Sequence, residues 1–98
     1  MTFKIKKTIN SSFKDHRGFY WTSWKNDKFK NIKFIHDKFS LSKKNVLRGL
    51  HGDNKTWKLV SCPYGKFRLV IVNCIKESKD YLKYRTWILS HKNGYQIN

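Results

Sequence analysis

The sequence predicts an all-β fold of antiparallel strands, arranged as a sandwich or a barrel. Strand-like apolar patterns recur along the chain at a spacing of about ten residues, whereas helical periodicity is nearly absent. Gly, Pro and Asn residues occur between these patterns, as expected for tight turns. Hydrophobic residues make up 39% of the 98 residues, too many for a disordered chain. We therefore expect one small domain over residues 1–98.

The first half of the chain contains four predicted strands. Residues 3–9 (FKIKKTI) alternate polar and apolar side chains, which is typical of a half-buried strand. Residues 18–24 (GFYWTSW) are rich in aromatic residues that favour strands. An alternating pattern also covers residues 31–42 (NIKFIHDKFSLS). A shorter apolar strand is predicted at 45–52 (NVLRGLHG), interrupted by Gly49.

The middle of the chain contains the strongest strand signal. Residues 56–62 (TWKLVSC) predict a strand that ends at a tight turn over 63–65, where Pro63 fixes φ. Residues 66–75 (KFRLVIVNCI) follow as a long strand. Its continuous apolar run, Leu69–Val72, predicts burial on both faces of the sheet.

The end of the chain predicts a strand at 84–90, a turn at 91–94 and the beginning of a further strand at 95–98. Cys62 and Cys74 are the only cysteines and form no CxxC pair. We expect both to be reduced thiols buried in strands. The start, MTFKIKKTIN, does not have the pattern of a signal peptide or a membrane span, so a cytoplasmic protein is expected.

The net charge of +16 favours an anionic partner. Nucleotides, sugar nucleotides, nucleic acid and an anionic membrane face all fit this charge. Three classes of function therefore stay open: an enzyme acting on an anionic substrate, a non-catalytic basic module that binds nucleotides or nucleic acid, and a structural dimerisation fragment. The aromatic residues alternate with apolar ones in predicted strands and resemble core positions, which makes nucleic acid a poor candidate.

The stretch NVLRGLHGDNKTWKLVSCPYGKF places the imidazole of His51 near the cations Arg48 and Lys58. In a regular strand, Arg48 and His51 point to opposite faces. A hairpin over GDNKT would bring His51 close to Lys58. Gly49 and Gly52 flank the imidazole and permit the close approach of a ligand. This stretch is therefore the candidate site.

Two longer stretches carry a family resemblance. DHRGFYWTSW, followed by KFIHDKFSLSKKNVLRGLHGDNKTWKLVSCPYGKF, resembles the dTDP-4-dehydrorhamnose 3,5-epimerase family over residues 13–97. The family motifs D-x-R-G-x-[FY], V-L-R-G-L-H and K-L-V are all present. The stretches at 36–39, 48–56 and 81–84 are most similar to GDP-4-keto-6-deoxy-heptose epimerases of capsule synthesis. The resemblance implies a cupin jelly roll or β-barrel, usually dimeric, with a sugar nucleotide in its mouth.

The resemblance also implies a reaction and its catalytic residues. The family abstracts a proton next to a ketone of a nucleoside-diphosphate 4-keto sugar and returns a proton to the opposite face. His51 matches the family's base, and an ordinary imidazole pKa of about 6.5 suits that role. Lys58 matches the lysine that stabilises the enolate oxygen.

Further residues match substrate contacts of the family. Arg48 lies near the substrate, and its planar guanidinium suits a diphosphate or a pair of hydroxyls. Arg17 matches a nucleotide contact that often comes from the neighbouring subunit, and Phe19 would form a wall beside the base or sugar. The alternative for Arg17 is a salt bridge with Asp15 within the turn.

Two substitutions bear on the substrate. The Gln and Asn of the family's F-x-Q-x-N motif are replaced here by His36 and Lys38, which we place among the substrate-binding residues. These changes favour a GDP-linked sugar over a standard dTDP-sugar pocket. No metal or other cofactor is implied, because His51 is not followed by the H-x-H pattern of metal-binding cupins.

Later segments of the family have no match in these 98 residues. They include a P-x-G-x-x-H segment, the Tyr that acts as the opposing acid, and an acidic residue that orients the catalytic His. We therefore expect a partial cupin domain. Three outcomes stay open: an inactive remnant, a truncated product, and half of a site that another chain completes. Dimerisation by strand exchange, which would cover the open edges of the sheet, is a further alternative.

Overall fold

The computed structural model describes residues 4–10, 12–25 and 31–98, and the regular structure in these ranges is entirely β. All strand pairs are antiparallel, which confirms the predicted fold class. The strands are β1 (Lys7–Ile9), β2 (Ser12–Asp15), β3 (Gly18–Trp21), β4 (Val60–Ser61), β5 (Lys66–Val72), β6 (Tyr84–Ser90) and β7 (Tyr95–Ile97).

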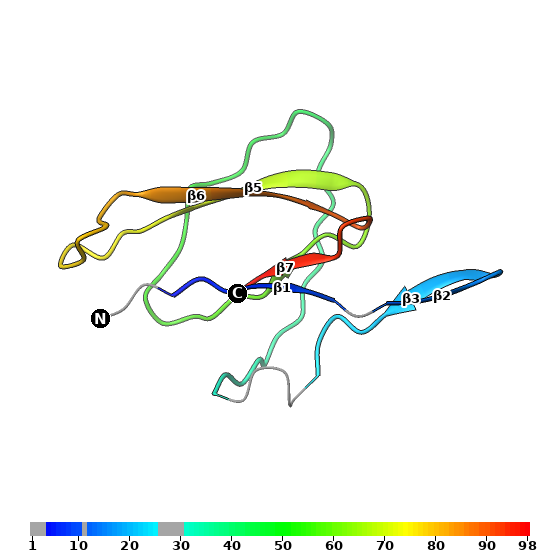
Figure 1. Ribbon diagram of the computed structural model, residues 1–98. Coiled ribbons are helices and arrows are strands. Elements are labelled where there is room, and N and C mark those ends of the chain that lie inside the picture. The colour runs from blue at the N-terminus through cyan, green and yellow to red at the C-terminus, as the bar shows by residue number, and fades with distance from the viewer. Residues whose placement is uncertain (1–3, 11, 26–30) are drawn as a thin grey trace.

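Two layers of strands build the folded part. One layer is a three-stranded sheet in the order β1-β7-β4, and the other is the β5–β6 hairpin. Figure 1 shows β5 and β6 running above β7 and β1, with the β2–β3 hairpin projecting to one side. The core between the layers contains Cys62, Leu89 and Ile97. Burying apolar surface between two sheets is the usual way in which such layers gain stability.

The β5–β6 hairpin pairs in register from Lys66 opposite Ser90 to Val72 opposite Tyr84. Strand alternation puts Leu69 and Ile71 on the face toward the core, while Val70 on the other face is 38% exposed. The prediction that Leu69–Val72 is buried on both faces is therefore wrong. This hairpin belongs to the outer layer of a two-layer structure, so only one of its faces is covered.

The central strand β7 contacts structure on both of its faces. Ile97 is 1% exposed and belongs to the core. Gln96 is 0% exposed, and its side chain lies on the opposite face of the strand. Gln96 Nε2 donates to the carbonyl oxygen of Ser23 at 2.6 Å. This bond fixes the chain that follows β3 against the sheet, and it satisfies a buried amide that would otherwise be costly.

Several predicted strands do not form. Residues 31–42 and 45–52 are fully described and contain no strand, and of 56–62 only Val60–Ser61 is one. A strand needs a hydrogen-bonded neighbour, and within the described residues the sheets offer these segments none. Most of their apolar side chains therefore face solvent, as shown by Phe39 at 82% and Leu47 at 95% exposure, whereas Ile32 and Phe34 are half-buried.

Other differences are smaller. Residues 12–15 form β2 although no strand was predicted there. Cys62 is buried beside β4, but Cys74 is exposed, so its predicted burial is wrong. Both thiols are free, as expected. The turns at 63–65 and 91–94 are confirmed. The described part of the chain holds no helix of the length and apolarity that a membrane span requires.

Candidate functional site

Five of the seven predicted site residues lie in one strandless segment, residues 31–59, which we call the connecting segment. All five side chains are exposed. The expectation that His51 lies in a strand, joined to Lys58 through a hairpin, is wrong, since neither residue belongs to a strand. The five residues are His36, Lys38, Arg48, His51 and Lys58.

The backbone around His51 is bent at Gly49, whose φ of 112° is one that residues with a side chain rarely adopt. A Cβ atom at Gly49 would lie 4.0 Å from Nδ1 of His51, so the imidazole folds back over the glycine. Arg48 Nε donates to Ser42 Oγ at 2.8 Å. This bond ties the residues before the bend to the chain six residues earlier and leaves the guanidinium exposed.

Asp53 organises the turn between His51 and Lys58. Its Oδ1 accepts hydrogen bonds from the backbone N–H groups of Lys55 at 2.8 Å and Thr56 at 2.7 Å. These two bonds, together with the Thr56 hydroxyl and the positive charge of Lys58, hold the pKa of the Asp53 carboxyl below its ordinary value. The local turn is therefore built around a carboxylate that stays ionised at neutral pH.

The remaining two predicted residues lie in the β2–β3 hairpin. Arg17 donates to Asp15 Oδ2 at 2.7 Å and, through its backbone N–H, to Oδ1 at 2.8 Å. The Arg17 side-chain bond is the main cause of the lowered pKa of Asp15. The structure thus contains the turn salt bridge that was the alternative for Arg17. Phe19 stacks on Trp21, with ring centroids 5.3 Å apart.

A shallow cavity of about 280 Å³ lies at this hairpin and is lined by Arg17, Phe19 and their neighbours Asp15, Gly18 and Tyr20. The structure therefore brings Arg17 and Phe19 together. The Arg17 side chain stays 78% exposed despite its ion pair, so it remains able to contact a second anion.

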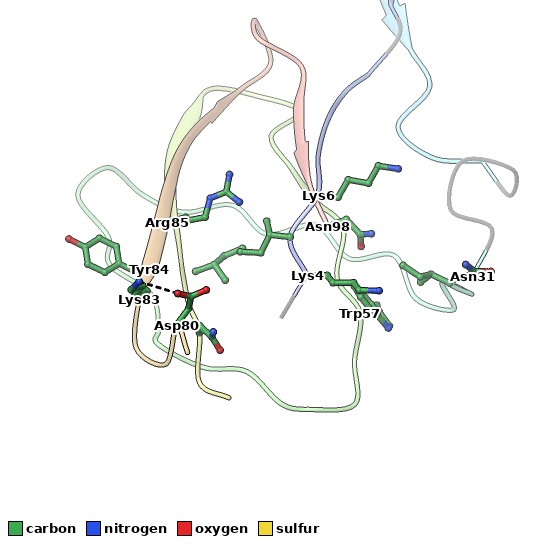
Figure 2. A pocket seen from close by; sticks show the side chains of 13 residues that line it. Lys4, Lys6, Asn31, Trp57, Asp80, Lys83, Tyr84, Arg85 and Asn98 are labelled. Carbon is green, nitrogen blue, oxygen red and sulfur yellow. Dashed lines mark ion pairs between the residues drawn. The ribbon is translucent and has the colours of Figure 1, made fainter. Parts of the chain in front are cut away.

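A larger open cavity of about 860 Å³ lies between β5–β6 and the chain at Lys4–Lys6. Figure 2 shows Arg85 on the β6 side, and Lys4, Lys6, Asn98 and Trp57 on the other. We call it the basic cavity, and none of the seven predicted site residues lines it. None of its cations was predicted to belong to a site. Lys4, Lys6 and Arg85 lie in predicted strands, and the matched stretch 81–84, which includes Lys83, was given no site residue. The described residues that line it are Lys4, Ile5, Lys6, Asn31, Ile32, Trp57, Ile71, Asn73, Asp80, Lys83, Tyr84, Arg85 and Asn98.

The chemistry that these groups allow is proton transfer with charge stabilisation. The imidazole of His51 is exposed and can accept a proton from a bound substrate. The ammonium of Lys58, on the same exposed turn, can stabilise negative charge that develops on an oxygen. The guanidinium groups of Arg17 and Arg48 suit phosphate or carboxylate oxygens.

Comparison with known proteins gives sequence relatives over most of this chain. A family profile described as dTDP-4-dehydrorhamnose 3,5-epimerase matches residues 4–98. The dTDP-4-dehydrorhamnose 3,5-epimerase of Salmonella typhimurium is 39% identical over 93 residues, which cover 87% of this chain and 51% of the relative. The Escherichia coli enzyme of the same name is 37% identical and covers 87% and 50%. The chain thus spans about half the length of these relatives.

Solved structures agree with this result. The dTDP-4-dehydrorhamnose 3,5-epimerase of Bacillus anthracis, solved with TDP and PPi bound, superposes with a TM-score of 0.82 at 27% identity. The match covers 95% of this chain and 58% of that one. The Elizabethkingia anophelis enzyme gives a TM-score of 0.77 at 30% identity, over 95% and 55%. On the strength of the match over residues 4–98, the chain belongs to the dTDP-4-dehydrorhamnose 3,5-epimerase family.

Proposed function

We propose that this chain acts on a nucleoside-diphosphate 4-keto-6-deoxy sugar as a 3,5-epimerase-type isomerase, by proton abstraction next to the ketone. The observation that carries the proposal is the family match over residues 4–98, which includes the R-G-L-H stretch and the following lysine. The match also supports one partial domain over residues 1–98. The chain spans about half the length of its relatives, so the activity for which they are named is a proposal for this chain.

In the proposed mechanism, the neutral imidazole of His51 takes the proton from the carbon beside the ketone. The electron pair moves into an enolate, and negative charge develops on the ketone oxygen. The ammonium of Lys58 stabilises that oxygen, where a well-placed donor typically changes the rate by a factor of about 10² to 10³. A proton then returns to the carbon as the enolate collapses to the ketone. Return of the abstracted proton by His51 to the same face gives exchange without inversion, whereas inversion requires a second acid that delivers its own proton to the opposite face.

The substrate-binding part of the proposal uses the other cations. Arg48 is proposed to bind the diphosphate or sugar hydroxyls, and Arg17 with Phe19 to contact the nucleotide. Their support is the exposed guanidinium of each arginine and the shallow cavity that Arg17 and Phe19 share. His36 and Lys38 are proposed to contact the substrate from the connecting segment, where both are exposed.

The sugar nucleotide is the finer part of the proposal. The relatives are named for dTDP-4-dehydrorhamnose, which makes a dTDP-linked sugar the first substrate to test. His36 and Lys38 replace residues of the family motif, which supports a GDP-linked keto sugar, including a heptose of capsule synthesis, as the second.

A homodimer is also proposed. Its support is the family resemblance and the apolar surface of the connecting segment, where Ile35, Leu41 and Leu50 are 74%, 87% and 78% exposed. Light scattering on the purified chain tests it, and a strictly monomeric mass at micromolar concentration would rule it out. A cytoplasmic location is proposed because Cys62 and Cys74 are both free thiols.

The activity test is proton exchange in deuterated water. The purified chain is incubated with dTDP-4-keto-6-deoxyglucose and, separately, with the GDP-linked analogue. NMR then follows deuterium at the two carbons that flank the ketone, and epimerisation is scored in the same spectra. We expect deuterium at one or both carbons, because exchange needs only one base.

Matched variants show whether the predicted residues carry the exchange. His51→Asn should lower the rate by a factor of about 10² to 10⁴, the usual contribution of a general base. Lys58→Met should also lower it, whereas Lys55→Met, on the same turn, should behave like the parent. Absence of deuterium with both sugars in a folded sample, or equal rates for His51→Asn and the parent, would refute the proposed chemistry.

A further inference from the structure

We propose that Gln96 is a positioning residue, which holds the β2–β3 hairpin in the orientation that lets Arg17 and Phe19 contact the substrate. This inference rests on the proposed function, where Arg17 and Phe19 are the nucleotide contacts. Gln96 lies on the central strand β7 and is not among the residues proposed to touch the substrate. It would act on binding only through the hairpin.

The buried amide of Gln96 is the first observation. Gln96 is 0% exposed, and a buried amide is costly unless its nitrogen and its oxygen have partners. Its Nε2 donates to the carbonyl oxygen of Ser23 at 2.6 Å, whereas the Thr8 hydroxyl donates to its Oε1 at the longer distance of 3.4 Å. The short bond joins residues 73 positions apart in the sequence, so it fixes tertiary structure rather than a local turn.

The attachment of the β2–β3 hairpin is the second observation. The hairpin is a separate two-stranded sheet, and it projects to one side of the two layers (Figure 1). No strand of the other sheets pairs with it within the described residues. Before β2, the backbone N–H of Asn10 donates to the carbonyl oxygen of Gly94 at 2.9 Å. After β3, the anchor is the bond from Gln96 to Ser23, two residues beyond Trp21. Anchors on both sides of its base set the direction in which the hairpin projects.

The chain at Ser23 also contacts the segment that carries the proposed base. The neighbouring Trp24 packs edge-on against Phe34 of the connecting segment, with ring centroids 6.2 Å apart. Residues 23–24 therefore touch β7 on one side and the connecting segment on the other. Loss of the Gln96 bond would release this junction and change the distance between the nucleotide contacts and His51.

The kinetic test uses Gln96→Met, which keeps the length of the side chain and removes its hydrogen bonds. Deuterium incorporation is measured against the concentration of dTDP-4-keto-6-deoxyglucose. We expect KM to rise about tenfold while kcat stays within about threefold, because the hairpin supplies binding and His51 supplies the chemistry. An unchanged KM, or a fall in kcat at constant KM, would overturn the positioning role.

Amide hydrogen exchange gives a readout that does not depend on activity. Gln96→Met should speed exchange in residues 12–21 by about tenfold, with residues 66–72 and 84–90 within about threefold of the parent. Unchanged exchange in residues 12–21 would overturn the proposal. If the parent chain is inactive, the proposed function fails, and the exchange result alone decides whether Gln96 anchors the hairpin.

The matched control is Asn73→Leu, which removes a second buried amide far along the chain from the hairpin. Asn73 is 2% exposed, and its side chain bonds to Ser78 Oγ at 3.0 Å and to the N–H of Ile75 at 2.9 Å. This variant should keep KM and the exchange of residues 12–21 within about twofold of the parent, because its bonds lie in the loop after β5. If it changes both as much as Gln96→Met does, the effect is general destabilisation and the positioning role is wrong.

A conservative variant tests the donor itself. Gln96→Glu keeps the shape of the side chain, and a protonated carboxyl can donate to the Ser23 carbonyl oxygen whereas a carboxylate cannot. Exchange in residues 12–21, divided by the intrinsic rate at each pH, should therefore be slow below the pKa of the introduced carboxyl and fast above it. Equal protection on both sides of that pKa would show that the bond to Ser23 does not hold the hairpin.

Discussion

The β5–β6 hairpin and the connecting segment have similarly apolar sequences but different structures. Residues 66–72 and 84–90 pair along their whole length and bury Leu89 completely. Residues 31–59, all of them described, form no strand, although their pattern of Ile, Phe, Leu and Val predicted two and part of a third. The comparison teaches that an alternating pattern becomes a strand only where a hydrogen-bonded neighbour is available.

The two regions also differ in role: one contains the residues that stabilise the fold, and the other contains most of the predicted site residues. The hairpin and the sheet that it packs on contain the buried core. The connecting segment contains His51, Lys58 and three other predicted site residues, all exposed. The core therefore sets whether the chain folds, whereas substitutions in the connecting segment should affect function with little effect on global stability.

The largest expected effect is on stability, at Leu89. Leu89→Ala should lower the free energy of unfolding by about 2–5 kcal/mol, because the site is fully enclosed. Leu47→Ala, at a position that is 95% exposed, should change it by less than about 0.5 kcal/mol. Urea unfolding followed by tryptophan fluorescence measures both. If Leu47→Ala is the more destabilising of the two, the connecting segment is part of the core.

A smaller effect is expected from two glycine substitutions. Gly94 ends the turn between β6 and β7 with φ of 65°, and a Cβ there would lie 2.5 Å from Asn10 Oδ1. Gly94→Ala should therefore cost about 1–2 kcal/mol, the penalty of a left-handed conformation. Gly52, in the connecting segment, has open space around it and no positive φ.

Gly52→Ala should thus leave the free energy of unfolding unchanged or slightly raised, because Ala reduces the freedom of the unfolded chain. The two variants are compared in the same urea titrations. If Gly52→Ala lowers the free energy of unfolding as much as Gly94→Ala does, the contrast between an ordered turn and an open segment is wrong.

The smallest effect concerns the pH dependence of stability. Asp15 has a pKa lowered from 3.8 by its bonds from Arg17. Since its folded pKa lies below the unfolded one, the ion pair stabilises the fold above about pH 3.8, and this contribution is lost as the pH falls through the folded pKa. Arg17→Gln should raise the Asp15 pKa toward 3.8. The free energy of unfolding of this variant should then depend less on pH in the acid range.

NMR titration of the Asp15 carboxyl checks this prediction, with Asp53 as an internal control. The lowered pKa of Asp53 depends mainly on backbone N–H groups of Lys55 and Thr56, so Arg17→Gln should leave it unchanged. An Asp15 pKa that does not respond to Arg17→Gln would show that the salt bridge is not formed in solution.

The fold class and the strongest strands could be predicted from the sequence. The strand at 84–90 has the predicted bounds, and the turns at 63–65 and 91–94 were predicted from Pro and Gly placement. Pairing could not be predicted, because it depends on which segments meet in space. β2, with its short polar sequence SFKD, forms because the adjacent GFYW pairs with it.

The candidate site was predictable only in part. The family motifs predicted His51, Lys58, Arg17 and Arg48 as site residues. The salt bridge between Arg17 and Asp15 was predicted as the alternative for Arg17, because the two opposite charges lie two residues apart in the sequence. The basic cavity was not predicted, because Lys4 and Lys6 alternate with apolar residues like solvated strand positions. The register of β6 on β5, which puts Arg85 on the inner face, was not available from the sequence alone.

Backbone amide hydrogen exchange compares the two regions most directly. Exchange of the unliganded chain, followed by mass spectrometry of short peptides, should give protection in residues 66–72 and 84–90 that exceeds protection in residues 31–59 by at least about two orders of magnitude. Equal protection of the connecting segment would show that it is paired in a ladder, and the separation of a stabilising core from an exposed segment that carries His51 and Lys58 would be wrong.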